Sequence, residues 1–259
     1  MRLTISLAQI DIALGRPEEN LAKVEGMVAE ASQRGSQIVL LPELWSTGYD
    51  LERAEEHART TERLLARLID LARERALFII GSLLSAEEGH LYNRATILSP
   101  KGVLVGEYTK IHLFRLMEEE KYFAPGTETP VFDFPWGKGA LAICYDLRFP
   151  ELFRKYALGG ARVVFLPAEW PYPRLEAWRI LLRARAIENQ FFMVGCNRVG
   201  ESKGKVFFGR SSIYDPWGEP VLEGGEEEGL LTAEIDLDEV DEARRKIPVF
   251  EDRREELYL

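Results

Sequence analysis

Residues 139–154 read Gly-Ala-Leu-Ala-Ile-Cys-Tyr-Asp-Leu-Arg-Phe-Pro-Glu-Leu-Phe-Arg, and this stretch decides the fold. The apolar run from Ala140 to Ile143 is typical of a buried strand, and Pro150 lies just inside a helical pattern. Cys144 therefore ends a strand at the turn before a helix, where a thiol can attack a substrate and backbone N–H groups can face the resulting oxyanion. Position alone equally fits a structural thiol, because free cysteine is among the most buried residue types.

Upstream of this stretch, apolar patterns predict strand, helix, strand, helix and then three strands. Leu21, Val24 and Val28 recur at helical spacing, as do Leu64, Leu68 and Leu71 in the second helix. The strands are expected at residues 3–9, 37–41, 77–80, 91–98 and 103–109.

The second half repeats this order, and three segments of the first half recur in it. The pairs are 38–42 with 163–167, 77–81 with 191–195, and 94–102 with 210–218. Two β-α-β halves that pair through their sheets and keep their helices outside predict an α/β fold, a four-layer α-β-β-α sandwich. We expect a single domain over residues 1–259, with a tail from about residue 236 that packs on the core or on a second subunit.

Composition narrows the class of protein. The 259 residues are 46% hydrophobic and 29% charged, as in an ordinary soluble globular protein. A net charge of −10 without a Lys/Arg run argues against nucleic acid or an anionic membrane as a partner. The sequence shows no signal-peptide pattern and no apolar run near the roughly 20 residues of a spanning helix. With only two cysteines, we expect free thiols and a cytoplasmic location.

Two charged residues occupy unusual positions. Glu43 follows an apolar strand and a proline, and glutamate is rarely buried without a partner or a task. Lys110 ends the strand before Ile-His-Leu-Phe114. The alternatives are a carboxylate that caps the next loop and a lysine that extends its ammonium group to solvent.

Together, Pro42-Glu43, Lys110-Ile-His-Leu-Phe114 and Cys144-Tyr-Asp-Leu-Arg-Phe-Pro-Glu151 resemble the Glu-Lys-Cys triad of the nitrilase superfamily, the carbon–nitrogen hydrolases. The resemblance extends over nearly the whole chain and includes the internal repeat. Within the superfamily, the loop Glu169-Trp-Pro-Tyr-Pro-Arg174 resembles that of the ω-amidases, which hydrolyse 2-oxoglutaramate and related dicarboxylic monoamides.

The resemblance implies hydrolysis of a small linear amide, an ω-monoamide of a dicarboxylic (2-oxo) acid, through a cysteine thioester with release of ammonia. In these terms Cys144 attacks, and Glu43 takes the thiol proton and later protonates the departing ammonia. Lys110 and the backbone N–H of Tyr145 hold the oxyanion. Substrate and water are the expected partners.

Supporting and substrate-binding residues also follow from the resemblance. By its distance from Gly126, Glu119 matches the family's second glutamate, although Glu118 and Glu120 remain alternatives. Arg174 is the candidate for holding the far carboxylate, and the Trp170 ring would shape the pocket. An arginine on a solvated helix start is the alternative for Arg174.

We expect no cofactor and no metal. His57, His90 and His112 do not form metal-ligand spacing with one another or with the cysteines. The chain has no P-loop and no strand-bounded G-x-G-x-x-G motif.

Other functions remain open at this point. Within the class, the alternatives are an N-carbamoyl-amine amidohydrolase and a nitrilase. From other classes come an inactive binding or scaffold protein that keeps the fold, and a Cys-His hydrolase that uses His112. Arg148 to Arg154 are expected to support the turn and an interface. The apolar residues Leu175, Trp178 and Leu182 are compatible with a homo-oligomer, a dimer or higher.

Overall fold

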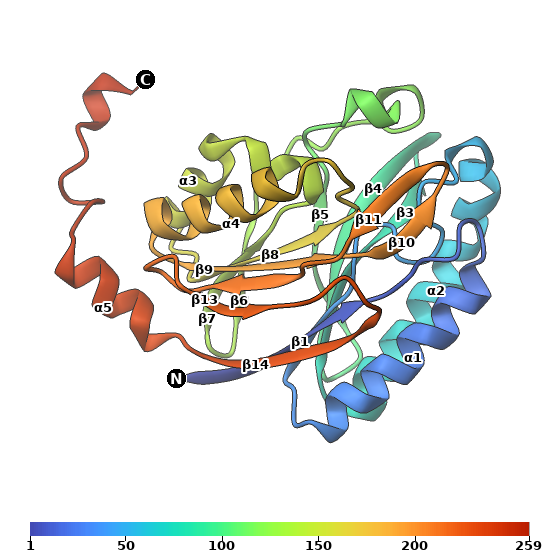
Figure 1. Cartoon of the computed structure of the whole chain (residues 1–259), viewed down its shortest axis with the longest axis horizontal. Helices are drawn as coiled ribbons and strands as arrows, with labels where there is room; N and C mark the ends of the chain where they lie inside the picture. The colour runs from blue at the N-terminus through green and yellow to red at the C-terminus, as the bar shows by residue number, and fades with distance from the viewer. Residues whose placement is uncertain (259) are drawn as a thin grey trace.

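The computed structural model describes residues 1–258. Two six-stranded sheets pack against each other, and a pair of helices covers the outer side of each (Figure 1). The predicted α/β class and the four-layer α-β-β-α sandwich are therefore confirmed.

The first sheet is built mainly from the first half of the chain and is covered by α1 (Pro17–Gln33) and α2 (Ala54–Arg75). Its strands, in spatial order, are β14 (Gly229–Asp236), β1 (Arg2–Gln9), β2 (Ile38–Leu40), β3 (Phe78–Glu87), β4 (His90–Leu98) and β5 (Leu104–Thr109). β1, β2 and β3 are parallel, whereas β14 returns from the far end of the chain to pair antiparallel with β1.

The second sheet lies beside α3 (Pro150–Leu158) and α4 (Leu175–Asn189). Its strands, in spatial order, are β13 (Pro220–Glu223), β12 (Ser212–Tyr214), β9 (Phe192–Asn197), β8 (Val163–Ala168), β7 (Gly137–Leu141) and β6 (Val131–Phe134). Here β7, β8 and β9 are parallel. A separate two-stranded ribbon, β10 (Val199–Ser202) with β11 (Lys205–Phe208), interrupts the repeat of the first half.

Successive side chains of each strand point alternately to the two faces of its sheet, and this explains the layers of the sandwich. Ile38 and Leu40 of β2 belong to the core that also contains the strands of the second sheet. The intervening Val39 packs in a second core with apolar residues of α1 and α2. Because successive side chains of a strand point to opposite faces, an unbroken apolar run is buried on both sides.

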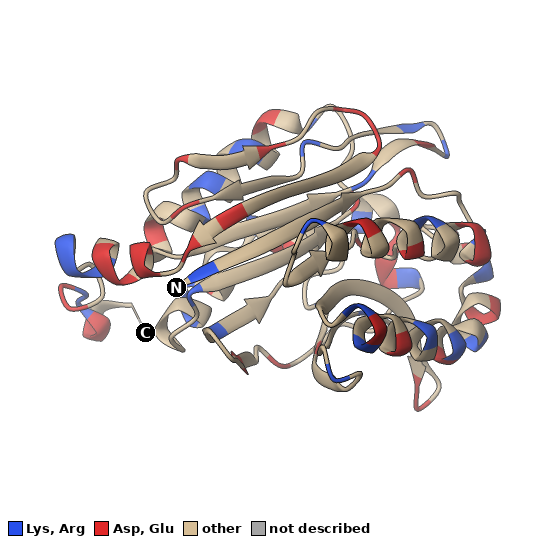
Figure 2. Cartoon of the chain, turned by 90° about the horizontal axis from the view of Figure 1, so that it is seen from below, with Lys and Arg blue, Asp and Glu red and all other residues tan. Residues whose placement is uncertain are grey.

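Charged residues gather on the outside of the molecule. Figure 2 shows acidic and basic residues interspersed along the flanking helices, while the strands are largely uncharged. No helix within residues 1–258 is long and apolar enough to cross a membrane.

The apolar residues of α4, which the sequence left open as core or interface, belong to the core. Trp178 and Leu182 are fully buried in the chain's own core, and Leu175 packs against that core. The exposed apolar residues of α4 are instead Ile180 and Ile187, with 61% and 46% of their surface accessible. Apolar periodicity locates the buried face of a helix without telling whether its own sheet or another chain covers it.

The end of the chain forms α5 (Asp238–Lys246) and a segment that leads away from the sandwich (Figure 1). Val240 and Ala243 of α5 are buried, and Gln190 Nε2 donates a hydrogen bond to the Ala243 carbonyl. This helix therefore contacts the body of the chain.

Candidate active site

Cys144 is the first residue of a short 3₁₀ turn, Cys144–Arg148, that joins β7 to α3. Its φ of 44° lies in the left-handed region, which non-glycine residues rarely adopt and which is found at functional turns. The side chain is only 5% exposed. Burial raises the pKa of the Cys144 thiol well above its usual range, and the Glu43 carboxylate, which hydrogen-bonds the thiol, raises it further. The resting thiol is therefore protonated and needs a base to become a nucleophile.

Glu43 follows β2 and is fully buried. Its Oε1 accepts hydrogen bonds from Lys110 Nζ at 2.7 Å, Asn93 Nδ2 at 2.8 Å and the Tyr49 hydroxyl at 2.9 Å. The backbone N–H of Glu169 donates to Oε2 at 3.0 Å. These four donors hold the carboxylate beside the thiol. Since Glu169 follows β8, the same bond joins the ends of strands from both sheets.

Lys110 lies between two carboxylates. Its Nζ is 2.7 Å from Glu43 Oε1 and 2.7 Å from Glu119 Oε1, and all three side chains are buried. Burial favours the neutral amine, but the charges of Glu119 and Glu43 outweigh it and hold the pKa of Lys110 above its usual value. The site thus contains a permanent cation next to the thiol.

The run Glu118–Glu120 separates into different environments. Glu119 is buried, and its Oε2 accepts a hydrogen bond from the Phe114 backbone N–H at 2.8 Å. The Tyr49 hydroxyl also lies against Glu119, so its single proton is shared between the Glu43 and Glu119 carboxyl groups. Glu118 and Glu120 are exposed, and Glu118 pairs with Lys121. The structure brings Glu119 alone of the three to Lys110.

Asp146 connects the nucleophile's turn to the segment that carries Lys110. Its Oδ2 accepts hydrogen bonds from the Ile143 backbone N–H at 2.8 Å and from the Tyr108 hydroxyl at 2.7 Å. Its Oδ1 lies 2.7 Å from His112 Nδ1. The His112 ring also stacks on Phe149, with centroids 3.5 Å apart. This geometry gives no support to a Cys144–His112 pair, because the imidazole is held by Asp146 and Phe149.

A small pocket opens onto Cys144. Its wall includes Trp170 and Arg174, the two predicted substrate-binding residues, and also Arg148, which the sequence assigned to the turn and an interface. The Arg148 guanidinium lies 5.0 Å from the centroid of the Trp170 ring, and that of Arg174 lies 5.5 Å from the centroid of Phe114. Neither guanidinium forms an ion pair with a carboxylate of the described chain, although the pocket is partly shielded from water.

Several residues of this site escaped sequence reasoning. Asn93, Tyr49 and Asp146 contact the triad or its turn. Asn93 and Tyr49 lie in segments that read as ordinary strand or loop, whereas Asp146 belongs to the Cys144 motif but had no role assigned. The only available signal was position, since Asn93 precedes Arg94 in the repeated segment and Asp146 follows Cys144 by two residues. Tyr145, predicted to offer its backbone N–H, follows Cys144, and its ring packs on Phe114 with centroids 4.7 Å apart.

Within residues 1–258, no group of three or more His, Cys, Asp or Glu side chains is arranged to hold a metal ion. The chemistry available to the site is that of a buried thiol, a carboxylate base and a fixed cation, which suits acyl transfer through a thioester.

Comparison with known proteins places this geometry in context. The chain matches a family model described as carbon-nitrogen hydrolase over residues 4–245. It is 44% identical to the 2-oxoglutaramate amidase of Bacillus subtilis (strain 168), over all of both chains. It is 32% identical to the human omega-amidase NIT2, covering 98% of this chain and 96% of the relative. A variant of the amidase from Nesterenkonia sp. AN1 superposes with a TM-score of 0.89 at 30% identity, covering 99% and 95% of the chains. That structure carries the acetamide moiety of fluoroacetamide on its active site cysteine.

Proposed function

This chain belongs to the carbon–nitrogen hydrolase family and hydrolyses amide C–N bonds with a cysteine thiol, and we propose that its substrate is the ω-monoamide of a small dicarboxylic 2-oxo acid. The observation that carries this proposal is the presence of two guanidinium groups without acidic partners, Arg148 and Arg174, in the pocket of Cys144. A planar guanidinium matches a carboxylate bidentately. The similarity to a 2-oxoglutaramate amidase supports the same substrate class.

We assign the first half-reaction to the triad. Glu43 removes the proton from Cys144 as Sγ attacks the amide carbon, and the carbonyl oxygen becomes an oxyanion. Lys110 and the Tyr145 backbone N–H stabilise this oxyanion; removal of one such donor typically lowers the rate about 10²–10³-fold. The C–N bond then breaks, the nitrogen takes the proton held by Glu43, and ammonia leaves a thioester on Cys144.

The second half-reaction reverses the roles. Glu43 removes a proton from water as its oxygen attacks the thioester carbon, and the same oxyanion site is used again. Collapse of this intermediate breaks the C–S bond, releases the free acid and returns the proton from Glu43 to the thiol. Glu119 and Tyr49 do not take part in these transfers. Their contacts hold the Lys110 ammonium and the Glu43 carboxylate in place.

Ammonia release from a matched panel tests the substrate class. We expect 2-oxoglutaramate and glutaramate, which both carry a carboxylate, to have a kcat/KM at least about tenfold above that of butyramide, which has the amide but no anion. Equal rates for all three would contradict the proposed class. Carbon dioxide release from N-carbamoyl compounds, or consumption of a nitrile, at a higher kcat/KM than the amides would favour the alternative reactions.

We also propose that the enzyme is a cytoplasmic homodimer. Free Cys144 and Cys196 support a reducing compartment. Exposed Ile180 and Ile187 lie seven residues apart on one face of α4, which supports an isologous contact through this helix. Light scattering of the wild type and of Ile180→Glu tests the dimer; a monomeric wild type would contradict it.

A further inference from the structure

The donors that hold Glu43 are divided unevenly between its two oxygens. Among the described residues, Glu43 Oε2 accepts a single hydrogen bond, from the backbone N–H of Glu169 at 3.0 Å. The donors at Glu43 Oε1 are Lys110, Asn93 and the Tyr49 hydroxyl. Because each carboxylate oxygen has two lone pairs, Oε1 is fully used, whereas Oε2 keeps one lone pair free. Oε2 is therefore the oxygen that can take a proton from the Cys144 thiol.

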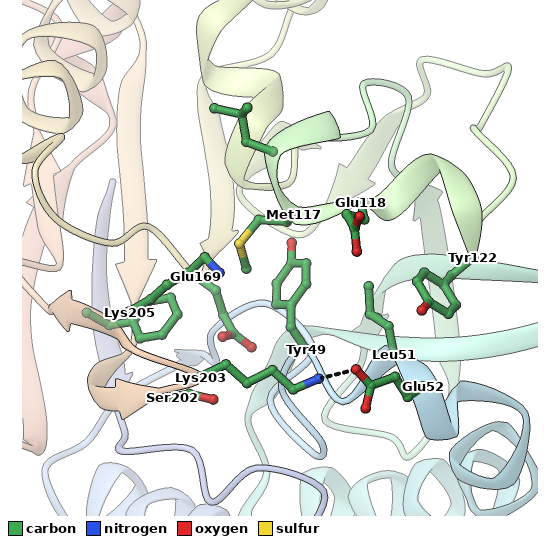
Figure 3. Close-up of a pocket in the computed structure, with 12 residues that line it drawn as sticks. Tyr49, Leu51, Glu52, Met117, Glu118, Tyr122, Glu169, Ser202, Lys203 and Lys205 are labelled. Carbon is green, nitrogen blue, oxygen red and sulfur yellow. Dashed lines mark hydrogen bonds and ion pairs between the residues drawn. The ribbon is translucent and has the colours of Figure 1, made fainter.

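The N–H group that contacts Glu43 Oε2 has a fixed position, because the side chain of the same residue is anchored. Glu169 is buried directly after β8, and its Oε2 accepts a hydrogen bond from Arg198 Nη1 at 3.2 Å. The backbone N–H of Arg198 also donates to the Ala168 carbonyl at 3.3 Å, so this segment is held at two neighbouring residues. Figure 3 shows Glu169 beside Tyr49, another of the Glu43 donors, at the wall of one pocket.

Arg198 is itself held from several sides. It is fully buried, and its Nη2 donates to the Ile12 carbonyl at 2.8 Å and to Asp11 Oδ1 at 3.2 Å. Its guanidinium lies 4.4 Å from the centroid of the Phe207 ring. Asp11 and Ile12 follow β1 of the first sheet, whereas Glu169 follows β8 of the second. The arginine thus joins the ends of strands from both sheets behind the base.

We propose that Glu43 Oε2 is the atom that deprotonates Cys144 and that Arg198 is the positioning residue that aims it, acting through Glu169. Arg198 lies outside the wall of the Cys144 pocket, so it does not act by binding substrate. Loss of its bond to Glu169 frees the N–H group that orients Oε2, and misplacement by about 1 Å can lower a rate about 10²-fold. This inference rests on the base assigned under the proposed function, and it adds the reacting oxygen and the group that holds it.

The bond between Arg198 and Glu169 does not need an ionised carboxyl group. Burial raises the pKa of Glu169 to about 8, against the opposing effect of Arg198. At pH 7 most of the carboxyl groups are therefore neutral, and a carbonyl oxygen accepts from the guanidinium as the oxygen of a glutamine amide would. Glu169→Gln accordingly keeps the bond, whereas Glu169→Leu removes it at a similar side-chain size.

The test compares these two variants on whichever amide of the panel above the wild type hydrolyses fastest. We expect Glu169→Leu to lower kcat about tenfold or more with KM within about twofold, because the base is displaced while the substrate-binding arginines remain. Glu169→Gln should keep both constants within about threefold of the wild type. Alkylation of Cys144 by iodoacetamide at pH 7 should slow in parallel with kcat, since it reports thiolate formation without a substrate.

Arg198→Met provides a second variant should Glu169→Leu fail to fold. It leaves a neutral carboxyl group at Glu169 and no unpaired buried charge, and we expect the same fall in kcat. The double variant Arg198→Met/Glu169→Leu should lie within about threefold of either single variant, because the two residues act in series. Arg67→Met, which breaks an ion pair with Glu25 between α1 and α2, is the matched control and should keep the wild-type kcat.

The outcomes separate this inference from the proposed function. A kcat within threefold of the wild type in Glu169→Leu or in Arg198→Met overturns the role of Arg198. A Glu169→Gln variant that falls as far as Glu169→Leu does the same, as do losses that multiply in the double variant. An active Glu43→Gln would instead contradict the base assigned under the proposed function.

Discussion

Asp146 Oδ1 accepts hydrogen bonds from both the backbone N–H and the ring Nδ1 of His112, at 3.1 and 2.7 Å. These bonds join the turn of Cys144 to a segment 34 residues earlier in the chain. Because His112 and Tyr108 flank Lys110, the single carboxylate of Asp146 sets the distance between nucleophile and cation. Asp146 and His112 thus act as positioning residues.

Substitution of Asp146 by Asn tests this relationship. Asn keeps the size but replaces one acceptor oxygen by a donor, which opposes the donors that surround it. We expect kcat to fall about 10–100-fold with KM nearly unchanged, since misplacement by about 1 Å has this effect on catalysis. The exposed Asp133→Asn is the matched control. A threefold or smaller fall in kcat would refute the positioning role.

Glu43→Gln should disable the thiol itself. The pKa of Cys144 lies well above its usual range, so the base is needed to generate the thiolate. We expect amidase activity to fall at least about 10³-fold, and alkylation of Cys144 by iodoacetamide at pH 7 to slow in parallel. Peptide mass mapping measures the labelled fraction. His112→Ala serves as the comparison, and alkylation that depends on His112 and not on Glu43 would speak for a Cys-His enzyme.

Lys110→Met should destabilise the fold as well as abolish turnover. The change leaves Glu43 and Glu119 as two buried carboxylates without their shared cation, and loss of one partner of a buried pair costs about 3–5 kcal/mol. Adding Glu119→Gln removes one of the stranded charges. Urea unfolding should therefore show the double variant to be more stable than Lys110→Met alone; additive losses would argue against the shared cation.

Arg174→Met should affect binding of the anionic end of the substrate. We expect KM for 2-oxoglutaramate to rise about tenfold or more, with kcat/KM for butyramide changed less than about threefold. Arg148→Met should show the same discrimination. Arg183→Met, on an exposed position of α4, is the control. A uniform loss on both substrates would place these arginines outside carboxylate recognition.

Glu169 also predicts a pH dependence of stability. Burial raises its pKa to about 8 in the folded chain, above the usual 4.5 of a glutamate, so the folded state binds the proton more tightly. Its contribution is therefore fully present below about pH 4.5 and is lost as the pH rises through 8. Relative to Glu169→Gln, the wild type should lose several degrees of Tm between pH 5 and pH 9. Parallel Tm curves for the two proteins would contradict the raised pKa.

Local pattern was sufficient for much of the fold. The apolar runs predicted β1, β2, β4 and β5 to within one or two residues, and the internal repeat predicted the pairing of two similar halves. These features depend on residues that are neighbours in sequence, where side-chain period and turn chemistry act directly. The same holds for the positions of Glu43, Lys110 and Cys144 at the ends of strands. Local sequence patterns did not predict the β10–β11 ribbon or the pairing of β14 with β1, because both depend on where other segments of the chain meet.

By itself, then, the sequence determined the two-sheet sandwich, the family and the thiol with its base and cation. Only the tertiary structure decided which glutamate of the 118–120 run contacts Lys110, that Arg148 lines the pocket, and that Glu169 is buried beside Arg198. The physical reason is that burial and hydrogen bonding in this site arise between segments tens of residues apart. The pKa of a carboxylate and its hydrogen-bond partners are set by the residues that surround it in space, and its neighbours in sequence do not specify those residues.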